Sequence, residues 1–289
     1  MTSIKAKVYA KINLSLDITG KRDDGYHTLS SVMQSVSLCD TITVSQCEGQ
    51  NPEIRLTCSN GTICGEDNLA FVAAKRFFDA AGIVPDAVIH IEKQIPLAGG
   101  LGGGSADAAA VLAVLNSAWG EPLSDQELFD IALSLGADVP FCLYGGTKLA
   151  EGIGEVLTPL KDMPDCLMLI AKKGVKSSTG DMYRRLDSAK SVKKSDLEVI
   201  KSGLDMGDVK LISKGLYNCF ETVCGEQSIS VKTEMLKSGA LYAGLSGAGP
   251  SVFGIFEDKA GREEAALKLK DMGCDVFFCS PSNKSFEII

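Results

Sequence analysis

The chain has 289 residues, of which 45% are hydrophobic and 23% charged, and its formal net charge is −8. This composition is typical of a globular protein, and the length suits one large domain or two ordinary ones. The negative charge argues against a general nucleic-acid binder, and the lack of an 18-residue apolar run argues against a membrane-spanning helix.

The start of the chain and its cysteines bear on the cellular compartment. Residues 1–7 contain lysines, but the apolar segment of a secretory signal does not follow them. The ten cysteines show no Cys-x-x-Cys spacing, and only two histidines are present to complete a zinc site. We therefore expect a cytoplasmic chain with reduced thiols and no metal site built from protein ligands.

The first expected element is a strand over residues 4–18. Every even position in this run is apolar, and a period of two is typical of a strand. Lys11 and Asn13 therefore share one face, which we expect to point away from the core. So long a run predicts a bend or a bulge. A turn at 20–25 and strands at 32–38 and 41–44 are expected next.

Capping residues delimit the expected helices of the first half. One helix follows Asp67 or Asn68 and stops at Gly82. Another begins with a capping box formed by Ser124 and Glu127. The other elements expected here are a strand at 87–93, an alanine-rich helix at 105–118 and short strands around residues 147 and 156.

The second half begins with a polar segment, 172–194, which predicts a loop carrying a short helix. Ser195 and Glu198 predict a second capping box. We place a domain boundary near residue 160, which gives domains 1–160 and 161–289. The remaining expected elements are strands at 167–171, 242–245, 252–256 and 275–279, and helices at 195–204, 208–219, 228–238 and 259–272.

The strongest chemical signal is a glycine-rich loop between a strand and a helix. Glycines fill five of the six positions 99–104, so backbone N–H groups can converge on a ligand without Cβ atoms in the way. The helix start adds unpaired N–H groups and partial positive charge, which suits a phosphate. The loop lacks the Lys-Ser/Thr of a P-loop and the third glycine of a dinucleotide fingerprint. A flexible surface loop is the alternative.

Asp138 and Lys11 each have a functional and a structural interpretation. Asp138 lies between a helix end and an apolar run, where a carboxylate can accept a proton or orient a hydroxyl. The same position suits a capping or turn aspartate. Lys11 has a similar structural interpretation, as an exposed lysine on the polar face of a strand. Spacing alone leaves both pairs of interpretations open.

A second glycine-rich segment, 245–252, joins two expected strands. Its backbone can form another anion-binding nest, and Gly247 and Gly249 are candidate substrate contacts. A tight hairpin turn explains the segment nearly as well.

Together, these segments resemble the motifs of the GHMP kinase family. That family has an N-terminal strand motif, a Pro-x3-Gly-Leu-Gly-Ser-Ser-Ala loop and a C-terminal glycine loop, which match residues 9–16, 96–106 and 245–252. Gly103 and Gly104 stand where many members have serines, and one branch of the family shares this variant. The resemblance covers nearly the whole chain. The segments shared with that branch include 10–14, 22–27, 66–69 and 135–140.

The resemblance implies an α+β, two-domain GHMP kinase fold with a mixed-sheet N-terminal nucleotide-binding domain and a ferredoxin-like C-terminal domain. It implies that ATP, with Mg²⁺, phosphorylates an alcohol. For the similar branch, that alcohol is the 2-hydroxyl of 4-diphosphocytidyl-2-C-methyl-D-erythritol on the non-mevalonate route to isoprenoid precursors. We thus expect a small cytidylyl partner, no nucleic acid or membrane, and a monomer or weak homodimer.

The resemblance also assigns roles to single residues. Asp138 matches the catalytic aspartate that takes or orients the hydroxyl proton. Lys11 matches the lysine that lowers the pKa of the attacking hydroxyl and offsets phosphoryl charge. Asn13 is a candidate donor to the acceptor, and Ser105 is a candidate for the phosphate or Mg²⁺ shell. The expected nucleotide-binding residues are Asn68, Pro96, Leu97, Ala98, Gly99, Gly100, Leu101, Gly102, Gly103, Gly104, Ser105 and Ala106.

Aromatic residues are the candidates for holding the cytosine base. Tyr26 and His27 can stack on a pyrimidine, and His27 can also form a hydrogen bond. We expect Tyr183 to close the opposite face of the base. The alternative for Tyr26 and His27 is a packed turn pair.

Two other functions remain open at this point. A GHMP kinase of the homoserine or mevalonate type has an acceptor without a base, which would leave Tyr26 and His27 without a purpose. A catalytically silent ATP-binding regulator would not need both Lys11 and Asp138. A panel of acceptor alcohols tested with ATP distinguishes these functions.

Overall fold

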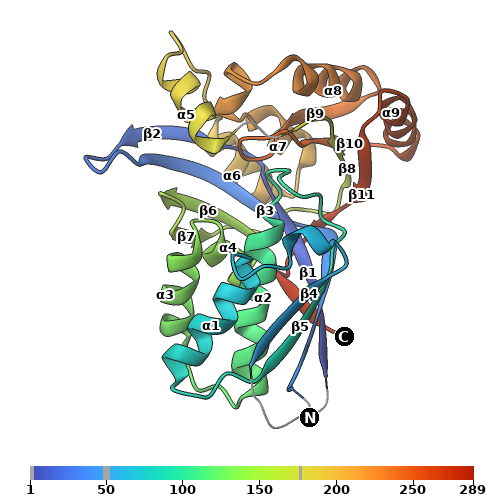
Figure 1. Cartoon of the computed structure of the whole chain (residues 1–289). Helices are drawn as coiled ribbons and strands as arrows, with labels where there is room; N and C mark the ends of the chain where they lie inside the picture. The colour runs from blue at the N-terminus through green and yellow to red at the C-terminus, as the bar shows by residue number, and fades with distance from the viewer. Residues whose placement is uncertain (1–2, 48–52, 176–177) are drawn as a thin grey trace.

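The structure is a computed structural model that describes residues 3–47, 53–175 and 178–289. Its strands form two sheets, with a group of helices beside each sheet (Figure 1). The expected α+β class is confirmed. Within the described ranges, no helix is both long enough and apolar enough to cross a membrane.

The first sheet is mixed and has nine strands in the described part of the chain. Its longest strand, β3, replaces the two strands expected at 32–38 and 41–44, and it pairs with β1, β5 and β6. The run expected at 4–18 divides at Asn13 into β1 and β2. The strands are β1 (Ile4–Asn13), β2 (Asp17–Lys21), β3 (His27–Ser45), β4 (Ile54–Cys58), β5 (Ala87–Glu92), β6 (Thr147–Gly152), β7 (Val156–Pro159), β12 (Pro281–Ser282) and β13 (Phe286–Ile288).

Helices lie beside this sheet (Figure 1), and α2 packs against β1 and β3. The expected caps are confirmed for α1, which follows Asn68 and stops at Gly82, and for α3, which begins at the Ser124–Glu127 capping box. The sequence did not predict the short helix α4. The bounds are α1 (Leu69–Ala81), α2 (Gly103–Ala118), α3 (Asp125–Leu135) and α4 (Val139–Tyr144), with a 3₁₀ turn η1 at Gly61–Ile63.

The second sheet is antiparallel, with the strand order β11-β8-β10-β9. Helices precede β9 and separate β10 from β11, so the βαββαβ order and the 4-1-3-2 strand order are those of a ferredoxin-like fold. The strands are β8 (Leu167–Lys172), β9 (Ala240–Leu245), β10 (Val252–Phe256) and β11 (Asp275–Cys279). The helices are α5 (Thr179–Asp187), α6 (Leu197–Met206), α7 (Val209–Gly215), α8 (Glu226–Lys237) and α9 (Lys259–Asp271), with a 3₁₀ turn η2 at Cys219–Thr222.

The capping box expected at Ser195 and Glu198 is wrong. Asp196 caps α6, and its side chain accepts a hydrogen bond from the Val199 N–H. The Ser195 hydroxyl instead donates to Asp17, at 2.5 Å, where β2 begins. Asp196 therefore occupies the capping position, and Ser195 connects the two halves of the chain through its hydrogen bond to Asp17.

The halves are joined by apolar packing and by the end of the chain. Ile12 of β1, Ile170 of β8 and Phe253 of β10 belong to one buried cluster that lies between the two sheets. Strands β12 and β13 return to the first sheet, where they pair with β3 and β1. We therefore still propose a domain boundary near residue 160, where the chain leaves the first sheet for the second. Residues 281–288 follow that boundary in sequence but adjoin the first sheet.

Candidate active site

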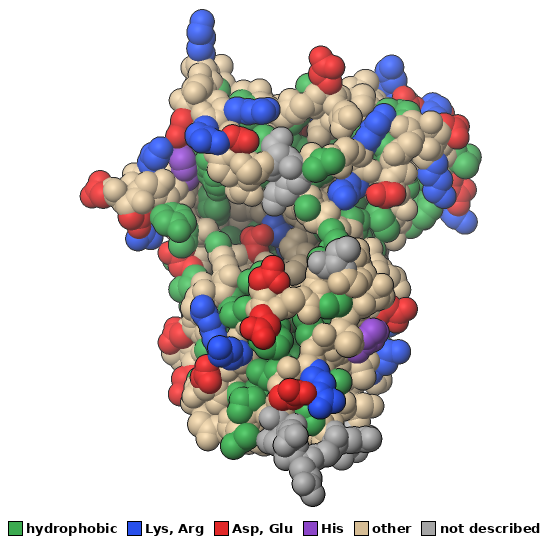
Figure 2. All heavy atoms as spheres, in the orientation of Figure 1, with side chains coloured by type: hydrophobic (Ala, Val, Ile, Leu, Met, Phe, Trp, Pro, Cys, Tyr) green, Lys and Arg blue, Asp and Glu red, His purple; other side chains and the backbone are tan. Residues whose placement is uncertain are grey.

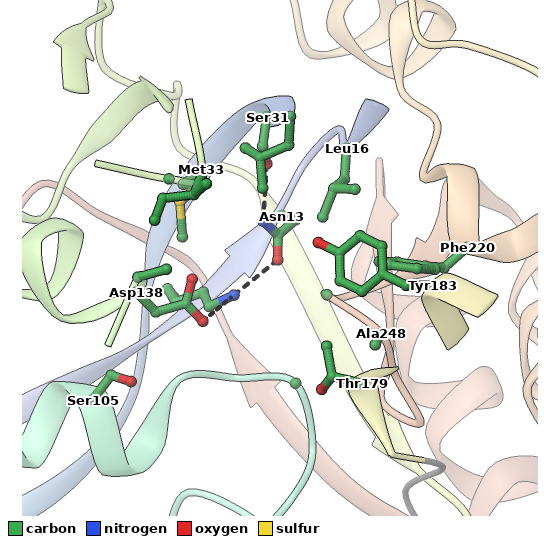
Figure 3. Close-up of a pocket in the computed structure, with 17 residues that line it drawn as sticks. Asn13, Leu16, Ser31, Met33, Ser105, Asp138, Thr179, Tyr183, Phe220 and Ala248 are labelled. Carbon is green, nitrogen blue, oxygen red and sulfur yellow. Dashed lines mark hydrogen bonds and ion pairs between the residues drawn. The ribbon is translucent and has the colours of Figure 1, made fainter. Parts of the chain in front are cut away.

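Strand β1 places Lys11 and Asn13 on one face, as the alternating pattern predicted. That face is not open to solvent, because each of the two residues is only 3% exposed. The Lys11 ammonium donates to Asn13 Oδ1 at 2.9 Å, and Asn13 Nδ2 donates to the Ser31 hydroxyl at 2.9 Å (Figure 3). The pairing of β1 with β3 thus fixes the orientation of the asparagine amide, which in turn fixes the lysine.

Asp138 faces the Lys11 ammonium from a different part of the chain. It precedes α4 at the capping position, but its side chain accepts no capping hydrogen bond from that helix in the described structure. Its carboxylate lies 3.1 Å from the Lys11 ammonium instead (Figure 3). Asp138 is 43% exposed, so its carboxylate is open to a ligand while it balances a buried cation. The structure therefore disfavours the capping interpretation.

The glycine loop adjoins this pair through backbone contacts. The Lys11 N–H donates to Leu101 O at 2.9 Å. Gly102, which precedes α2, has a φ of 70° and offers no side-chain acceptor to the helix start within the described chain. A Cβ on Gly102 would lie 2.8 Å from Lys11 Cγ. Only glycine allows the loop this close to the lysine, and the first N–H groups of α2 stay available for an anion.

For the ATP-dependent activity that the resemblance implies, we expect Gly102→Ala to lower kcat/KM for ATP by about 10- to 100-fold, because the added methyl group displaces the loop and Lys11 from each other. Steady-state kinetics at varied ATP concentration measures this loss. Gly120→Ala is the matched control, since Gly120 also has a positive φ, 84°, but a Cβ there would meet nothing within 4 Å. An equal loss in both variants would attribute the effect to backbone strain and contradict the prediction.

Three cavities lie in a row along this region. The glycine loop lines a cavity of about 250 Å³, which we call the phosphate-side cavity. Lys11 and Asn13 line a central cavity of about 270 Å³, and Tyr26 and His27 line an outer cavity of about 660 Å³. The first two share Asp138 as a lining residue, and the last two share Tyr183. Figure 2 shows this face of the molecule hollowed between its lower and upper parts. The arrangement suits an elongated pair of ligands that meet at the centre.

The hairpin-turn interpretation of the segment 245–252 is confirmed, whereas its role as an anion-binding nest stays a prediction. The segment is a tight connection between two antiparallel strands, closed by a hydrogen bond from the Ser246 N–H to Ser251 O. It also packs on the first glycine loop, because the Ser246 hydroxyl donates to Gly100 O at 2.8 Å. Gly247 lines the central cavity, whereas Gly249 is not among its lining residues.

The aromatic end differs from the expected sandwich. The rings of His27 and Tyr183 stack on each other with centroids 4.6 Å apart and planes inclined by 17°. Rings in direct contact leave no room for a base between them, so Tyr183 supports His27 and does not face it across a gap. Tyr26 is 64% exposed and lines the outer cavity with His27.

Asn68 and Ala106 do not line the phosphate-side cavity. Asn68 donates to Ile63 O and caps α1, and Ala106 is buried in the core. The other expected nucleotide-binding residues, 96–105, all line that cavity.

Sequence reasoning missed Lys93, which lines the phosphate-side cavity. Its ammonium makes ion pairs with Asp40 and with Asp107, the latter at 2.6 Å. Burial opposes the charge of Lys93, but Asp107 and Asp40 outweigh burial and raise its pKa. Burial, aided by Asp40, raises the pKa of Asp107 to about 7. The available signal was a lysine shortly before the loop at 96–106, although its buried partner Asp40 lies 53 positions away in sequence.

The side chains suit a metal ion only if the ion brings phosphate ligands with it. Among the described residues, no group of three or more His, Cys, Asp or Glu side chains could hold a metal. Mg²⁺ commonly takes one or two protein oxygens and completes its shell with phosphates and water. Ser105 and Asp138 both line the phosphate-side cavity and provide such oxygens.

Family models match both halves of the chain. The model of the GHMP kinases N terminal domain matches residues 68–146, and that of the GHMP kinases C terminal domain matches residues 198–273. The chain therefore belongs to the GHMP kinase family. This result confirms the family resemblance that was based on one strand motif and two glycine-rich loops.

The chain is also similar to individual proteins over nearly its whole length. The chain is 44% identical over 271 residues to a 4-diphosphocytidyl-2-C-methyl-D-erythritol kinase of Caldicellulosiruptor bescii, covering 92% of this chain and 94% of that one. A protein of the same name from Thermoanaerobacter pseudethanolicus is 38% identical, covering 100% and 99%. A crystal structure of 4-(cytidine 5'-diphospho)-2C-methyl-D-erythritol kinase superposes with a TM-score of 0.83 at 30% identity, covering 96% and 99%.

Proposed function

We propose that this chain transfers the γ-phosphoryl group of ATP to the 2-hydroxyl of 4-diphosphocytidyl-2-C-methyl-D-erythritol. The observation that carries the proposal is the Lys11–Asp138 pair, which lies between the cavity lined by the glycine loop and the aromatic-lined outer cavity. The names of the relatives that match nearly the whole chain support the same acceptor. The homoserine and mevalonate alternatives find only fold-level support, at 21% identity or less.

The chemistry follows from the position of each group. The N–H groups of residues 99–105 bind the triphosphate, as helix starts and glycine loops do. The acceptor hydroxyl lies in the central cavity, where Asp138 takes or orients its proton as the oxygen attacks the γ-phosphorus and ADP leaves. Lys11 favours the ionised hydroxyl and offsets charge on the transferring group. Asn13 retains one amide hydrogen for the acceptor, since Ser31 receives the other.

Mg²⁺ would be held by the ATP phosphates together with Ser105 or Asp138, and when bound it neutralises phosphate charge. The residues of this chain then need only position the reactants and exclude water. That requirement is consistent with so few charged side chains in the central cavity.

We expect His27→Ala to raise KM for the cytidylyl acceptor by about 10-fold while KM for ATP stays near normal, because only the base loses a ring that contacts it. Initial-rate kinetics with each substrate varied in turn measures both constants. The control is His90→Ala, which removes the other histidine, an exposed residue of β5. An unchanged acceptor KM in His27→Ala would show that the base is bound elsewhere.

A panel of acceptors tests the proposed function directly. The purified chain is incubated with ATP, Mg²⁺ and either the cytidylyl acceptor, homoserine or mevalonate, and products are identified by ³¹P NMR and mass spectrometry. We expect one new phosphate monoester, at the 2-position of the cytidylyl acceptor. Phosphorylation of homoserine or mevalonate at a higher kcat/KM would refute the acceptor, and ATP binding without any product would favour a silent regulator.

We further propose that the chain acts in the cytoplasm as a monomer or weak homodimer with a small-molecule partner. The ten cysteines are free thiols, four of them buried, which suits a reducing compartment. Sedimentation at micromolar concentration measures the oligomeric state.

A further inference from the structure

A single carboxylate at the end of α5 holds the His27 side chain in the wall of the outer cavity. Asp187 is the last residue of α5, and its Oδ1 lies 2.6 Å from Nε2 of His27, which is 160 positions away in sequence. The other carboxylate oxygen, Oδ2, accepts a hydrogen bond from the Lys21 ammonium at 2.9 Å. The hairpin of β2 and β3, which lies beside α5 (Figure 1), is thereby tied to that helix. The tie is at His27, the candidate base-binding ring of the outer cavity.

The chemistry of this contact fixes where the imidazole proton lies. Hydrogen bonds from Lys21 and then His27 hold the pKa of Asp187 below its usual range. The carboxylate is therefore ionised at neutral pH and can only accept hydrogen bonds. The proton in the short contact must then belong to Nε2, and the other nitrogen of a neutral imidazole, Nδ1, is an acceptor.

The surroundings keep that acceptor available. The His27 side chain is only 10% exposed, and its ring plane is fixed by stacking on Tyr183. Nδ1 forms no hydrogen bond with any residue of the described ranges. Because His27 lines the outer cavity, a nearly buried, oriented acceptor on its ring is suited to a ligand that brings a donor.

We propose that Asp187 is a positioning residue that locks His27 in the Nε2–H tautomer, so that Nδ1 selects a base with an amino group, such as cytosine, over one with a carbonyl group there, such as uracil. This inference rests on the proposed cytidylyl acceptor. The 4-amino group of cytosine donates to Nδ1, whereas the 4-carbonyl oxygen of uracil would place two acceptors against each other. A site that requires a donor discriminates strongly against an analogue that lacks it.

The tautomer can be measured without any substrate. The chain has only two histidines, His27 and His90, so a ¹⁵N–¹H spectrum of histidine-labelled protein is assigned with one His90→Gln variant. At pH 8 we expect the His27 shifts of a single Nε2–H tautomer, and a mixture of tautomers in Asp187→Ala. A wild-type Nδ1–H tautomer, or an unchanged spectrum in Asp187→Ala, would overturn the inference.

Kinetics tests the consequence for base selection. In Asp187→Ala we expect KM for the cytidylyl acceptor to rise about 10-fold with kcat and the ATP KM unchanged, and the preference for it over its uridylyl analogue to fall about 10-fold. Asp187→Asn retains an acceptor oxygen and is expected to restore most of the preference. Asp181→Ala is the control on the same helix, since Asp181 pairs with Arg184 and not with His27.

The outcomes separate this inference from the proposed function. A wild-type chain that does not phosphorylate the cytidylyl acceptor contradicts the proposed function, whatever the spectrum shows. An active wild-type chain whose base preference and His27 spectrum are unaffected by Asp187→Ala contradicts the role of Asp187 alone.

Discussion

Asp138→Asn is expected to lower kcat by about 100-fold or more while the chain stays folded. The amide has nearly the same shape as the carboxylate, but it cannot accept a proton at neutral pH and carries no charge to pair with Lys11 at 3.1 Å. Because Asp138 is 43% exposed and caps no helix N–H in the described structure, its replacement removes chemistry and little packing. The rate of ADP release with saturating ATP and acceptor measures kcat.

The control for this loss is Asp79→Asn, an exposed aspartate of α1 that lines none of the three cavities. We expect it to keep wild-type turnover. Thermal unfolding and circular dichroism of both variants establish that they are folded. Near-normal turnover in Asp138→Asn would remove this carboxylate from proton transfer and from the orientation of the hydroxyl.

The second large effect is expected for Lys11→Ala, which should also lower kcat by about 100-fold or more. The ammonium is the buried positive charge shared by Asn13 and Asp138 in the central cavity. Without it, the acceptor hydroxyl is harder to ionise and charge on the transferring phosphoryl group is less well offset. Single-turnover phosphorylation, followed after mixing enzyme and ATP with the acceptor, reports the transfer step itself.

Because Lys11 is only 3% exposed, truncation also leaves a small cavity, so Lys11→Met is needed alongside it. The methionine fills the space without a charge, and we expect the same loss of kcat. Lys7→Ala is the control, since Lys7 lies on the same strand but is exposed. Recovery of turnover in Lys11→Met would show that the lysine supports packing and not phosphoryl transfer.

Features that depend on nearby residues could be predicted from the sequence. The helix starts at Asn68 and at the Ser124–Glu127 capping box were predicted because a capping side chain bonds to N–H groups two or three residues away. The shared face of Lys11 and Asn13 follows from the alternation of a strand. The exception, at Ser195, arose because Asp196 is an equally good cap and Asp17 offered the serine a partner.

Features set by distant contacts could not be predicted from pattern alone. The pairing of Lys11 with Asp138 depends on α4, a six-residue helix too short to show a period, because Asp138 lies at its start. The stacking of Tyr183 on His27 depends on how α5 meets the hairpin of β2 and β3. The return of β12 and β13 to the first sheet had no local signature, because strands of two and three residues are shorter than any alternation.

A crystal structure with a non-hydrolysable ATP analogue, Mg²⁺ and the cytidylyl acceptor tests the central claim most directly. We predict the triphosphate on the N–H groups of residues 99–105, and the 2-hydroxyl oxygen about 3–3.5 Å from the γ-phosphorus and within hydrogen-bond reach of Asp138 and Lys11. A triphosphate bound away from the glycine loop, or a hydroxyl beyond the reach of both side chains, would contradict the account.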